Sequence, residues 1–183
     1  RRAGERVMQS ITRFITGKLK LKVNESKSAV ARPAERKFLG FSFTNGKQPK
    51  RRIAPKSLLR FKKRIRELTK RNRGVSLERM VEQLRLYLTG WRGYFGFCET
   101  RSVLRDLDSW IRRRLRCFQW KQWKRGKTRF AELRKRGVGK DLAAQTAGSS
   151  RGLWHLSRSP ALNIALPGAY FDSLGLPRLS EAG

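Results

Sequence analysis

Apolar residues recur every three or four positions between Pro55 and Trp123, which is the spacing of one buried face of an α-helix. The pattern falls into three segments, with breaks at Gly74 and before Ser102. Ser76 opens the second segment and is suited to cap a helix, because its hydroxyl can accept a hydrogen bond from a backbone N–H of the first turn. Three amphipathic helices with short connections predict a compact helical bundle. The apolar positions are Leu58, Phe61, Ile65 and Leu68, then Leu77, Met80, Val81, Leu84, Leu88 and Trp91, then Val103, Leu107, Trp110, Ile111, Leu115 and Phe118.

The part of the chain before this bundle carries shorter and mixed patterns. Leu19, Leu21 and Val23 alternate with lysines, which is typical of a half-buried strand, and Asn45-Gly46 is a strong hairpin signal. Too few strands are predicted to close a sheet, so these elements indicate the edge of an α+β domain. The expected elements are a helix over residues 5–16, strands at 19–23, 38–43 and 51–53, and turns at 24–27 and 45–46.

The part after the bundle is basic and punctuated by glycine, beginning at residues 124–127. A helix is predicted over 128–136, residues 147–168 are rich in Gly, Ser and Pro, and a short helix over 169–174 ends at Gly175. The whole pattern predicts an α+β chain that is mostly α: partial strands, a three-helix bundle and a basic helical tail.

The charge balance points to a polyanionic partner. Lys and Arg total 45 against 13 Asp and Glu, which gives a formal net charge of +32 and a pI near 11.7. Self-repulsion of this size opposes compaction unless an anion binds. The hydrophobic fraction of 38%, with 5 Trp and 10 Phe, is too high for a disordered basic tail. We therefore expect a folded nucleic-acid-binding protein, with a merely soluble basic domain as the alternative.

The sequence lacks the residues that a metal site, a catalytic site or a membrane span would require. Cys98, Cys117 and the single His155 do not have zinc-ligand spacing, and buried thiols in the cell interior are expected. Asp106 and Asp108 would point in different directions on a helix, so we expect a surface pair that balances arginines rather than a metal site. Neither a phosphate-cradling glycine loop nor a His-based triad is present, so the sequence predicts no complete active site. The sequence holds no run of about eighteen apolar residues, so no membrane span is expected.

Basic and aromatic side chains alternate along the third predicted helix and just beyond it. Arginine and lysine neutralise phosphates, while aromatic faces stack on unpaired bases. Aromatic residues on the apolar stripe are expected in the core, whereas for Trp120 and Trp123 core packing and base stacking both stay open. His155, beside Trp154, is expected to be packed or to stack on RNA. The expected nucleic-acid-binding residues are Arg60, Lys63, Arg64, Arg92, Tyr94, Arg112, Arg113, Arg116, Trp120, Lys121, Trp123 and Lys124.

Specific motifs then occur in a fixed order along the chain. They read Leu19-Lys20-Leu21-Lys22-Val23-Asn24-Glu25-Ser26-Lys27-Ser28, Phe38-Leu39-Gly40-Phe41, Leu88-Thr89-Gly90-Trp91-Arg92-Gly93-Tyr94-Phe95, Leu107-Asp108-Ser109-Trp110-Ile111-Arg112-Arg113-Arg114, Trp120-Lys121-Gln122-Trp123-Lys124, Ser150-Arg151-Gly152-Leu153-Trp154 and Tyr170-Phe171-Asp172-Ser173-Leu174-Gly175-Leu176. The first two resemble the last two conserved blocks of a reverse-transcriptase palm. The others resemble the maturase-specific segment of bacterial group II intron-encoded reverse transcriptases, and the resemblance covers nearly the whole chain.

The resemblance implies a division of the chain. Residues 1–54 would be the C-terminal edge of the palm, 55–125 the thumb or maturase-specific domain X, and 126–183 a basic DNA-binding-like tail. It also implies a cytoplasmic protein whose partners are group II intron RNA and the RNA/DNA template–primer duplex, with target DNA as a further partner. We expect the final part of a longer polymerase, with no endonuclease domain after it.

The resemblance also implies roles for two palm features. Lys27 matches the lysine that would protonate the leaving pyrophosphate, a general acid only in the presence of the rest of the palm, and otherwise a turn lysine in solvent. Phe38, Leu39, Gly40 and Phe41 match the primer grip, although the two phenylalanines can equally be packing residues. The Tyr-Ala-Asp-Asp motif that holds Mg²⁺ in the full-length polymerase is absent from this sequence. We therefore expect no cofactor and no polymerisation by this chain alone.

The expected function is to bind intron RNA and the template–primer duplex, and so to assist RNA splicing and reverse transcription. The alternative is a stand-alone RNA-binding splicing or structural factor without polymerase activity.

Overall fold

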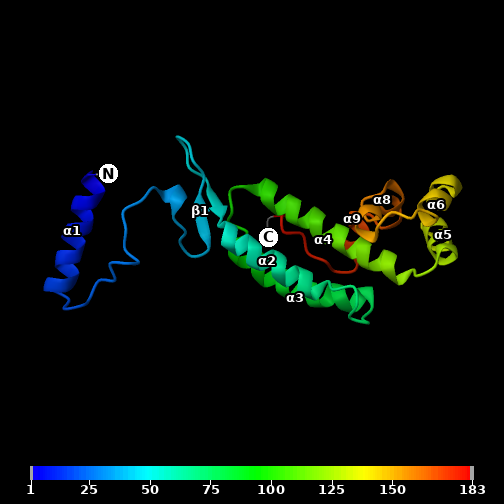
Figure 1. Cartoon of the computed structure of the whole chain (residues 1–183), viewed down its shortest axis with the longest axis horizontal. Coiled ribbons are helices and arrows are strands. Elements are labelled where there is room, and N and C mark those ends of the chain that lie inside the picture. Colours follow the sequence, from blue (N-terminus) through cyan, green and yellow to red (C-terminus); the bar gives the residue numbers. More distant parts are fainter. Residues whose placement is uncertain (1, 182–183) are drawn as a thin grey trace. The chain divides into compact units, whose positions relative to one another are not determined.

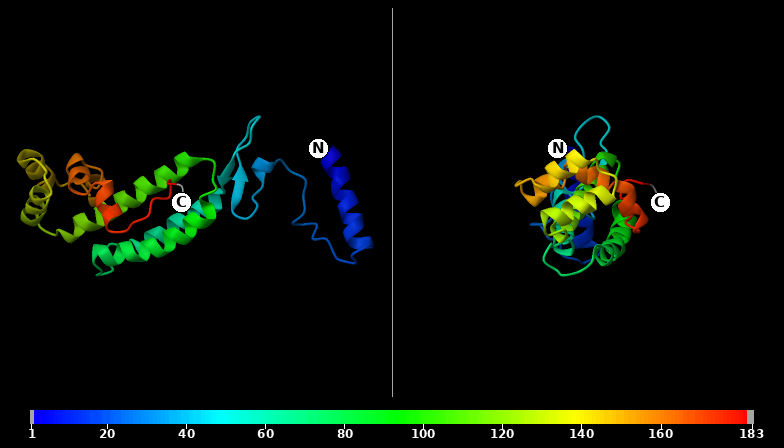
Figure 2. Two further views of the ribbon diagram at one scale, coloured as in Figure 1. Left: turned by 180° about the vertical axis from the view of Figure 1, so that it is seen from behind. Right: turned by 90° about the vertical axis from the view of Figure 1, so that its right-hand side faces the viewer.

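The structure of the chain, a computed structural model, describes residues 2–181. Its backbone groups into two compact units, Arg1–Ala54 and Pro55–Gly183, drawn in Figure 1 and from two further directions in Figure 2. Helices dominate, and among the described residues the strands form one two-stranded antiparallel sheet. The predicted α+β, mostly α class is confirmed. The predicted domains at the two ends of the chain include residues 1 and 182–183, which lie outside the described part.

The first unit begins with helix α1, Arg2–Gly17, which confirms the helix predicted there. The predicted turn at residues 24–27 also forms, and the Lys27 N–H donates a hydrogen bond to Asn24 Oδ1 at 3.1 Å. The strand predicted over residues 19–23 is wrong, because no strand forms there and Lys20 has a φ of +53°. An extended segment becomes a strand only when its backbone groups pair with a neighbour, and alternation of side chains alone does not supply one.

A β-hairpin follows a single 3-10 turn, η1, at Pro33–Glu35. Strand β1, Phe41–Phe43, pairs antiparallel with β2, Arg51–Ile53, which confirms the hairpin predicted at Asn45-Gly46. The loop between the strands is closed by the Thr44 N–H, which donates to the Lys50 carbonyl at 2.9 Å.

The first strand is shorter than the predicted range of 38–43 because a tight turn interrupts it. Phe38 and Phe41 exchange two backbone hydrogen bonds of 2.9 Å across Leu39 and Gly40, whose φ angles are +47° and +78°. Positive φ at both central residues defines a type I′ turn. Gly40 adopts this conformation freely, whereas Leu39 does so against the ordinary preference of a branched side chain.

The second unit is built on three long helices, α2 (Pro55–Leu68), α3 (Leu77–Phe95) and α4 (Arg101–Gln122), which form the predicted bundle with α3 against both others (Figure 1). Ser76 caps α3 as predicted, because the Arg79 N–H donates to Ser76 Oγ at 3.2 Å. The buried apolar residues match the predicted stripe except at Leu58, Val103 and Trp110, which are half-buried; they are Phe61, Ile65, Leu68, Leu77, Met80, Val81, Leu84, Leu88, Trp91, Leu107, Ile111, Leu115 and Phe118.

Shorter helices complete the second unit. They are α5 (Gly126–Lys135), α6 (Lys140–Ala147), α7 (Leu153–Leu156), α8 (Pro160–Ala165) and α9 (Gly168–Ser173). The first and last of these confirm the two helices predicted in this region, and the middle three were not predicted. Helices α5, α6 and α8 contact one another, while α7 packs against α4. These short helices, coloured yellow to red in Figure 1, belong to the same unit as the bundle.

The C-terminal segment lies along α4, where Asp108 holds it (Figure 1). Asp108 Oδ1 accepts a hydrogen bond from the Leu179 N–H at 2.9 Å, and Oδ2 accepts from the N–H and hydroxyl of Ser180 at 3.0 and 2.8 Å. Asp108 is therefore buried, and its prediction as a surface residue is wrong, whereas its neighbour Asp106 is exposed as predicted. The free cysteines Cys98 and Cys117 are both buried, which confirms that prediction.

Candidate nucleic-acid interface

Cations greatly outnumber acids in the second unit. Residues 55–183 carry 30 Lys and Arg against 10 Asp and Glu. Most of these acids are already engaged within the protein. Among the described residues, ion pairs join Glu67, Glu82, Asp108, Glu132, Asp172 and Glu181 to Arg64, Arg79, Arg112, Arg136 and Arg178. Because only these five arginines take up the paired carboxylates, the remaining cations make a surface that attracts anions.

A small pocket between the end of α2, α4 and α7 gathers several of the remaining cations. It has a volume of about 170 Å³ and is lined by Thr69, Arg71, Arg114, Cys117 and Trp154; we call it the arginine pocket. Arg114 Nε donates to Thr69 Oγ1 at 2.6 Å, and the Thr69 hydroxyl in turn donates to a carbonyl of the preceding helical turn at 2.6 Å. Arg71 donates to Cys117 Sγ at 3.7 Å. These neutral acceptors fix both guanidinium groups without neutralising their charge.

Like charges crowd around this pocket. Burial lowers the pKa of Arg114, and the positive charges of Arg66 and Arg71 lower it further. Burial also lowers the pKa of Arg113, and the charge of Arg158 adds to the effect. Guanidinium groups nevertheless remain protonated in proteins. Since none of the ion pairs among residues 2–181 engages these five arginines, an anion placed here would relieve their mutual repulsion.

Trp154 is the aromatic wall of the arginine pocket. The Arg113 guanidinium lies over one face of its ring, 3.9 Å from the centroid, and Arg113 also donates to the Trp154 carbonyl at 2.9 Å. The Trp154 residue nevertheless remains 40% exposed. Trp110 differs, because Arg66 and Arg114 both approach its ring, at 5.7 and 5.3 Å from the centroid. Trp154 therefore combines a fixed ring with surface that a base can reach.

A wider hollow of about 680 Å³ lies next to the arginine pocket and shares α7 with it. Hydroxyl and cationic groups dominate its polar lining, and Arg151 contacts His155 Nε2 at 3.1 Å. Arg158 lines the hollow and also acts electrostatically on Arg113 beside the pocket. The two concave regions therefore belong to one cationic surface, formed by α2, α4, α7 and the loops around α7.

Several predicted nucleic-acid-binding residues lie at the surface of the second unit. Arg60, Lys63 and Lys124 are exposed, and none of the described ion pairs engages them. Arg64 is exposed as well, but it pairs with Glu67 at 3.2 Å. The first three are therefore the better placed to meet a phosphate.

Others among the predicted residues, of which Lys121 and Tyr94 are exposed and Arg92 is half-buried, already contact other parts of the protein. Lys121 donates to the side-chain oxygen of Asn72, and Arg92 donates to the Arg178 carbonyl at 3.3 Å. Tyr94 is exposed at the end of α3. A nucleic acid that bound these residues would compete with or add to contacts within the chain.

Arg112 and Arg116 contact later elements of the second unit. Arg112 is buried and pairs with Asp172 at 2.5 Å and with Asp108 at 3.5 Å. Arg116 is half-buried and donates to the Leu166 carbonyl at 2.9 Å. Arg112 therefore joins α4 to α9 and Arg116 joins α4 to the C-cap of α8, while their role as phosphate contacts stays a prediction.

Trp120 and Trp123 belong to the core and not to a stacking surface. Trp120 is 0% exposed and Trp123 only 5%. The guanidinium groups of Arg129 and Arg136, from α5 and its C-cap, lie over the two rings, 4.7 and 4.9 Å from the centroids. Arginines from outside the predicted stacking motif thus cover the two tryptophan rings.

In the first unit, the two features matched to the palm lie at turns. Lys27 is exposed within the turn at residues 24–27. Phe38 and Leu39 are 76% and 66% exposed in the type I′ turn that Gly40 completes, and Phe41 begins β1. Their roles as general acid and primer grip stay predictions.

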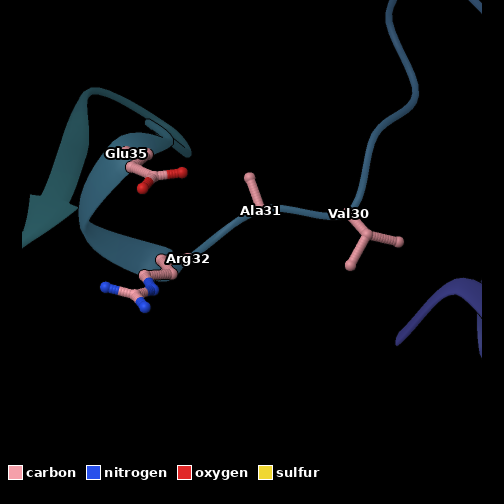
Figure 3. A pocket seen from close by; sticks show the side chains of 4 residues that line it. All are labelled: Val30, Ala31, Arg32 and Glu35. Atoms are coloured by element: carbon pink, nitrogen blue, oxygen red, sulfur yellow. The ribbon is translucent and has the colours of Figure 1, made fainter. Parts of the chain in front are cut away.

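A hollow in the first unit does not have the character of a binding site. Its lining residues are Val30, Ala31, Arg32 and Glu35. Figure 3 shows Glu35 in the η1 turn, Arg32 just before that turn and Val30 in the extended stretch further upstream, with side chains that point in different directions. Polar groups that fix a ligand converge on one point, and these do not.

Residues 2–181 contain no group of three or more His, Cys, Asp or Glu that could hold a metal ion. Within the same residues, no helix combines the length and the apolar character needed to cross a membrane.

The fold and the surface together define a class: a basic, mainly helical module whose exposed cations suit a polyanion. Residues 58–137 match the family model of the group II intron maturase-specific domain. This segment runs from within α2 to just beyond α5, and the match agrees with the resemblance and is consistent with the C-terminal part of a group II intron maturase. A search of the curated proteins gives no match to the chain.

Proposed function

We propose that the chain binds the RNA of a group II intron through the cationic surface formed by α2, α4, α7 and the loops around α7, and that this binding assists splicing. The observation that carries the proposal is the set of arginines around the arginine pocket, which have no acidic partner among residues 2–181, in a unit whose residues 58–137 match the maturase-specific domain. Cations fixed by neutral acceptors keep their full charge for a ligand, so they favour a polyanion.

The protein's part in splicing would be to hold the folded RNA. Arginine and lysine contacts to phosphates give affinity without requiring a particular sequence, and an A-form duplex is recognised mostly by its shape and backbone. Splicing chemistry would belong to the RNA, whose compact fold the bound cations stabilise by offsetting phosphate repulsion.

The proposal extends to the template–primer duplex and reverse transcription when a palm is present. Phe38, Leu39, Gly40 and Phe41 would then contact the primer, and Lys27 would act as general acid. Mg²⁺ in such an enzyme would supply the charge that two-metal phosphoryl transfer needs. Residues 2–181 offer no group of three or more acidic or other metal-binding side chains that would hold that ion.

The first test is the binding of a structured intron RNA to the purified chain over a range of KCl concentrations. We expect affinity to fall by about a thousandfold or more between about 50 and 200 mM salt, because a surface that contacts six or more phosphates releases that many counterions. Addition of the chain should also increase splicing of the same intron RNA at limiting Mg²⁺. Binding that is absent, or that does not change with salt, would contradict the proposal.

A further inference from the structure

The arginine pocket has two features that a duplex-binding surface does not require. It is concave, and one of its walls is an aromatic ring, that of Trp154. The cations that line it, Arg71 and Arg114, come from the loop after α2 and from the middle of α4. A pocket that places an accessible ring beside fixed guanidinium groups matches the two parts of a nucleotide, its base and its phosphate.

The size of the pocket favours one unit of a polymer over a free small molecule. Pockets for small ligands usually have volumes of about 300–1,000 Å³, so that most of the ligand is enclosed. The arginine pocket, at about 170 Å³, is smaller. It can bind the phosphate and one face of the base of a single nucleotide. The rest of the RNA strand would then continue along the surrounding cationic surface.

The position of Trp154 favours an unpaired nucleotide over a paired one. Arg113 covers one face of the ring at 3.9 Å from the centroid, which fixes the ring and leaves the exposed part for another stacking partner. A base within a duplex is already stacked on both sides, whereas bases in loops and bulges can be turned outward and stacked on aromatic side chains.

We propose that the arginine pocket binds one unpaired nucleotide of an RNA, with its base stacked on Trp154 and its phosphate bound by Arg71 and Arg114. This inference rests on the proposed RNA-binding function and adds a preference to it: RNA with an extruded nucleotide binds better than continuous duplex. Thr69 and Cys117 serve as the neutral acceptors that position the two guanidinium groups.

The test uses the full chain and two RNA hairpins that differ only in one unpaired 2-aminopurine. We expect the bulged hairpin to bind about tenfold more tightly than the fully paired one, because base–aromatic stacking contributes on this scale. Binding should also quench the 2-aminopurine fluorescence. Trp154→Ala should abolish both the preference and the quenching, and Trp154→Phe should retain most of each.

Arginine variants test the phosphate contact separately. Arg71→Ala should weaken binding of the bulged hairpin and reduce its salt slope by roughly the contribution of one phosphate, about 0.7–0.9. Arg101→Ala, which removes an exposed arginine from the first turn of α4, should change neither the preference nor the quenching.

The outcomes separate the two proposals. Equal affinity of the wild-type chain for both hairpins, or an equal loss for both with Trp154→Ala, would overturn the nucleotide pocket and leave general RNA binding intact. Failure to bind either hairpin would overturn the proposed function itself. Circular dichroism of each variant checks that the helices are retained, and Trp154→Phe provides a reading should the alanine variant unfold.

Discussion

A single carboxylate, that of Asp108, decides where the C-terminal residues lie. It accepts three hydrogen bonds from Leu179 and Ser180 and pairs with Arg112, all in a buried position. Charged groups that are removed from water require such complete pairing, and the loss of one partner leaves the others unsatisfied. Asp108 is thus the acceptor that joins α4 to a segment some seventy residues later in the sequence.

Replacing Asp108 by Ala should therefore lower the free energy of unfolding by about 2–4 kcal/mol, because the Leu179 and Ser180 N–H groups lose their acceptor and the buried Arg112 loses one of its two carboxylate partners. Urea denaturation measures the loss, and hydrogen exchange at the Leu179 and Ser180 amides should accelerate. Asp106→Ala on the exposed side of the same helix is the matched control and should change stability by less than about 0.5 kcal/mol. Equal effects of the two substitutions would show that Asp108 does not hold the segment.

At the scale of elements, helices with a continuous apolar stripe could be predicted from the sequence. The pattern repeats over 14 to 22 residues in α2, α3 and α4, so these helices are predictable, and most of their expected core residues are confirmed. The strand expected at residues 19–23 failed because a strand depends on a partner that its own sequence does not encode. Helices α7 and α8 were missed because four and six residues are too few to show a period.

The candidate site was less predictable than the fold. The basic faces follow from composition, but the arginine pocket brings together Thr69, Arg114 and Trp154, which are far apart in sequence. The sequence alone cannot show whether Trp120 and Trp123 stack on bases or pack in the core. Basic and aromatic residues alternate in the same way in both cases. Only the position of α5 decides between the two.

One element boundary offers a direct test. Ser76 Oγ accepts the Arg79 N–H at the start of α3, so Ser76→Ala should lower the free energy of unfolding by about 1 kcal/mol and Ser76→Gly by only a few tenths. Ser102→Ala is a suitable control, since Ser102 is exposed in the first turn of α4, whose cap makes no side-chain hydrogen bond. A loss as large for Ser102→Ala as for Ser76→Ala would contradict the capping role.

At the scale of the whole molecule, a net charge of +32 opposes folding unless ions or a ligand compensate it. The ion pairs among residues 2–181 engage few of the cations. Dissolved ions and bound anions must therefore screen or neutralise most of the repulsion between like charges. Folding stability and anion binding are consequently linked in this protein, since any anion that prefers the folded chain stabilises it.

Thermal unfolding followed by circular dichroism should show this link. Raising KCl from about 50 to 300 mM should raise the midpoint, because the Debye length falls and screens the repulsion. Heparin, a polyanion, should raise it further by several degrees at low salt, as about 1 kcal/mol corresponds to roughly 2–4 °C for a chain of this size. Uncharged dextran at the same mass concentration should have no such effect. A midpoint of thermal unfolding that changes with neither salt nor heparin would show that charge repulsion does not limit the stability of the fold.

The stacking of arginines on tryptophans has a consequence for how the sequence can evolve. Trp110, Trp120, Trp123 and Trp154 each lie against a guanidinium group. Lysine would keep the charge at these positions but not the planar group, so an exchange that is neutral elsewhere on this surface is costly here. Substitution of lysine for arginine should therefore be tolerated over most of the basic faces during evolution. Arg113, Arg129 and Arg136 should be retained because their planar groups stack on tryptophan rings.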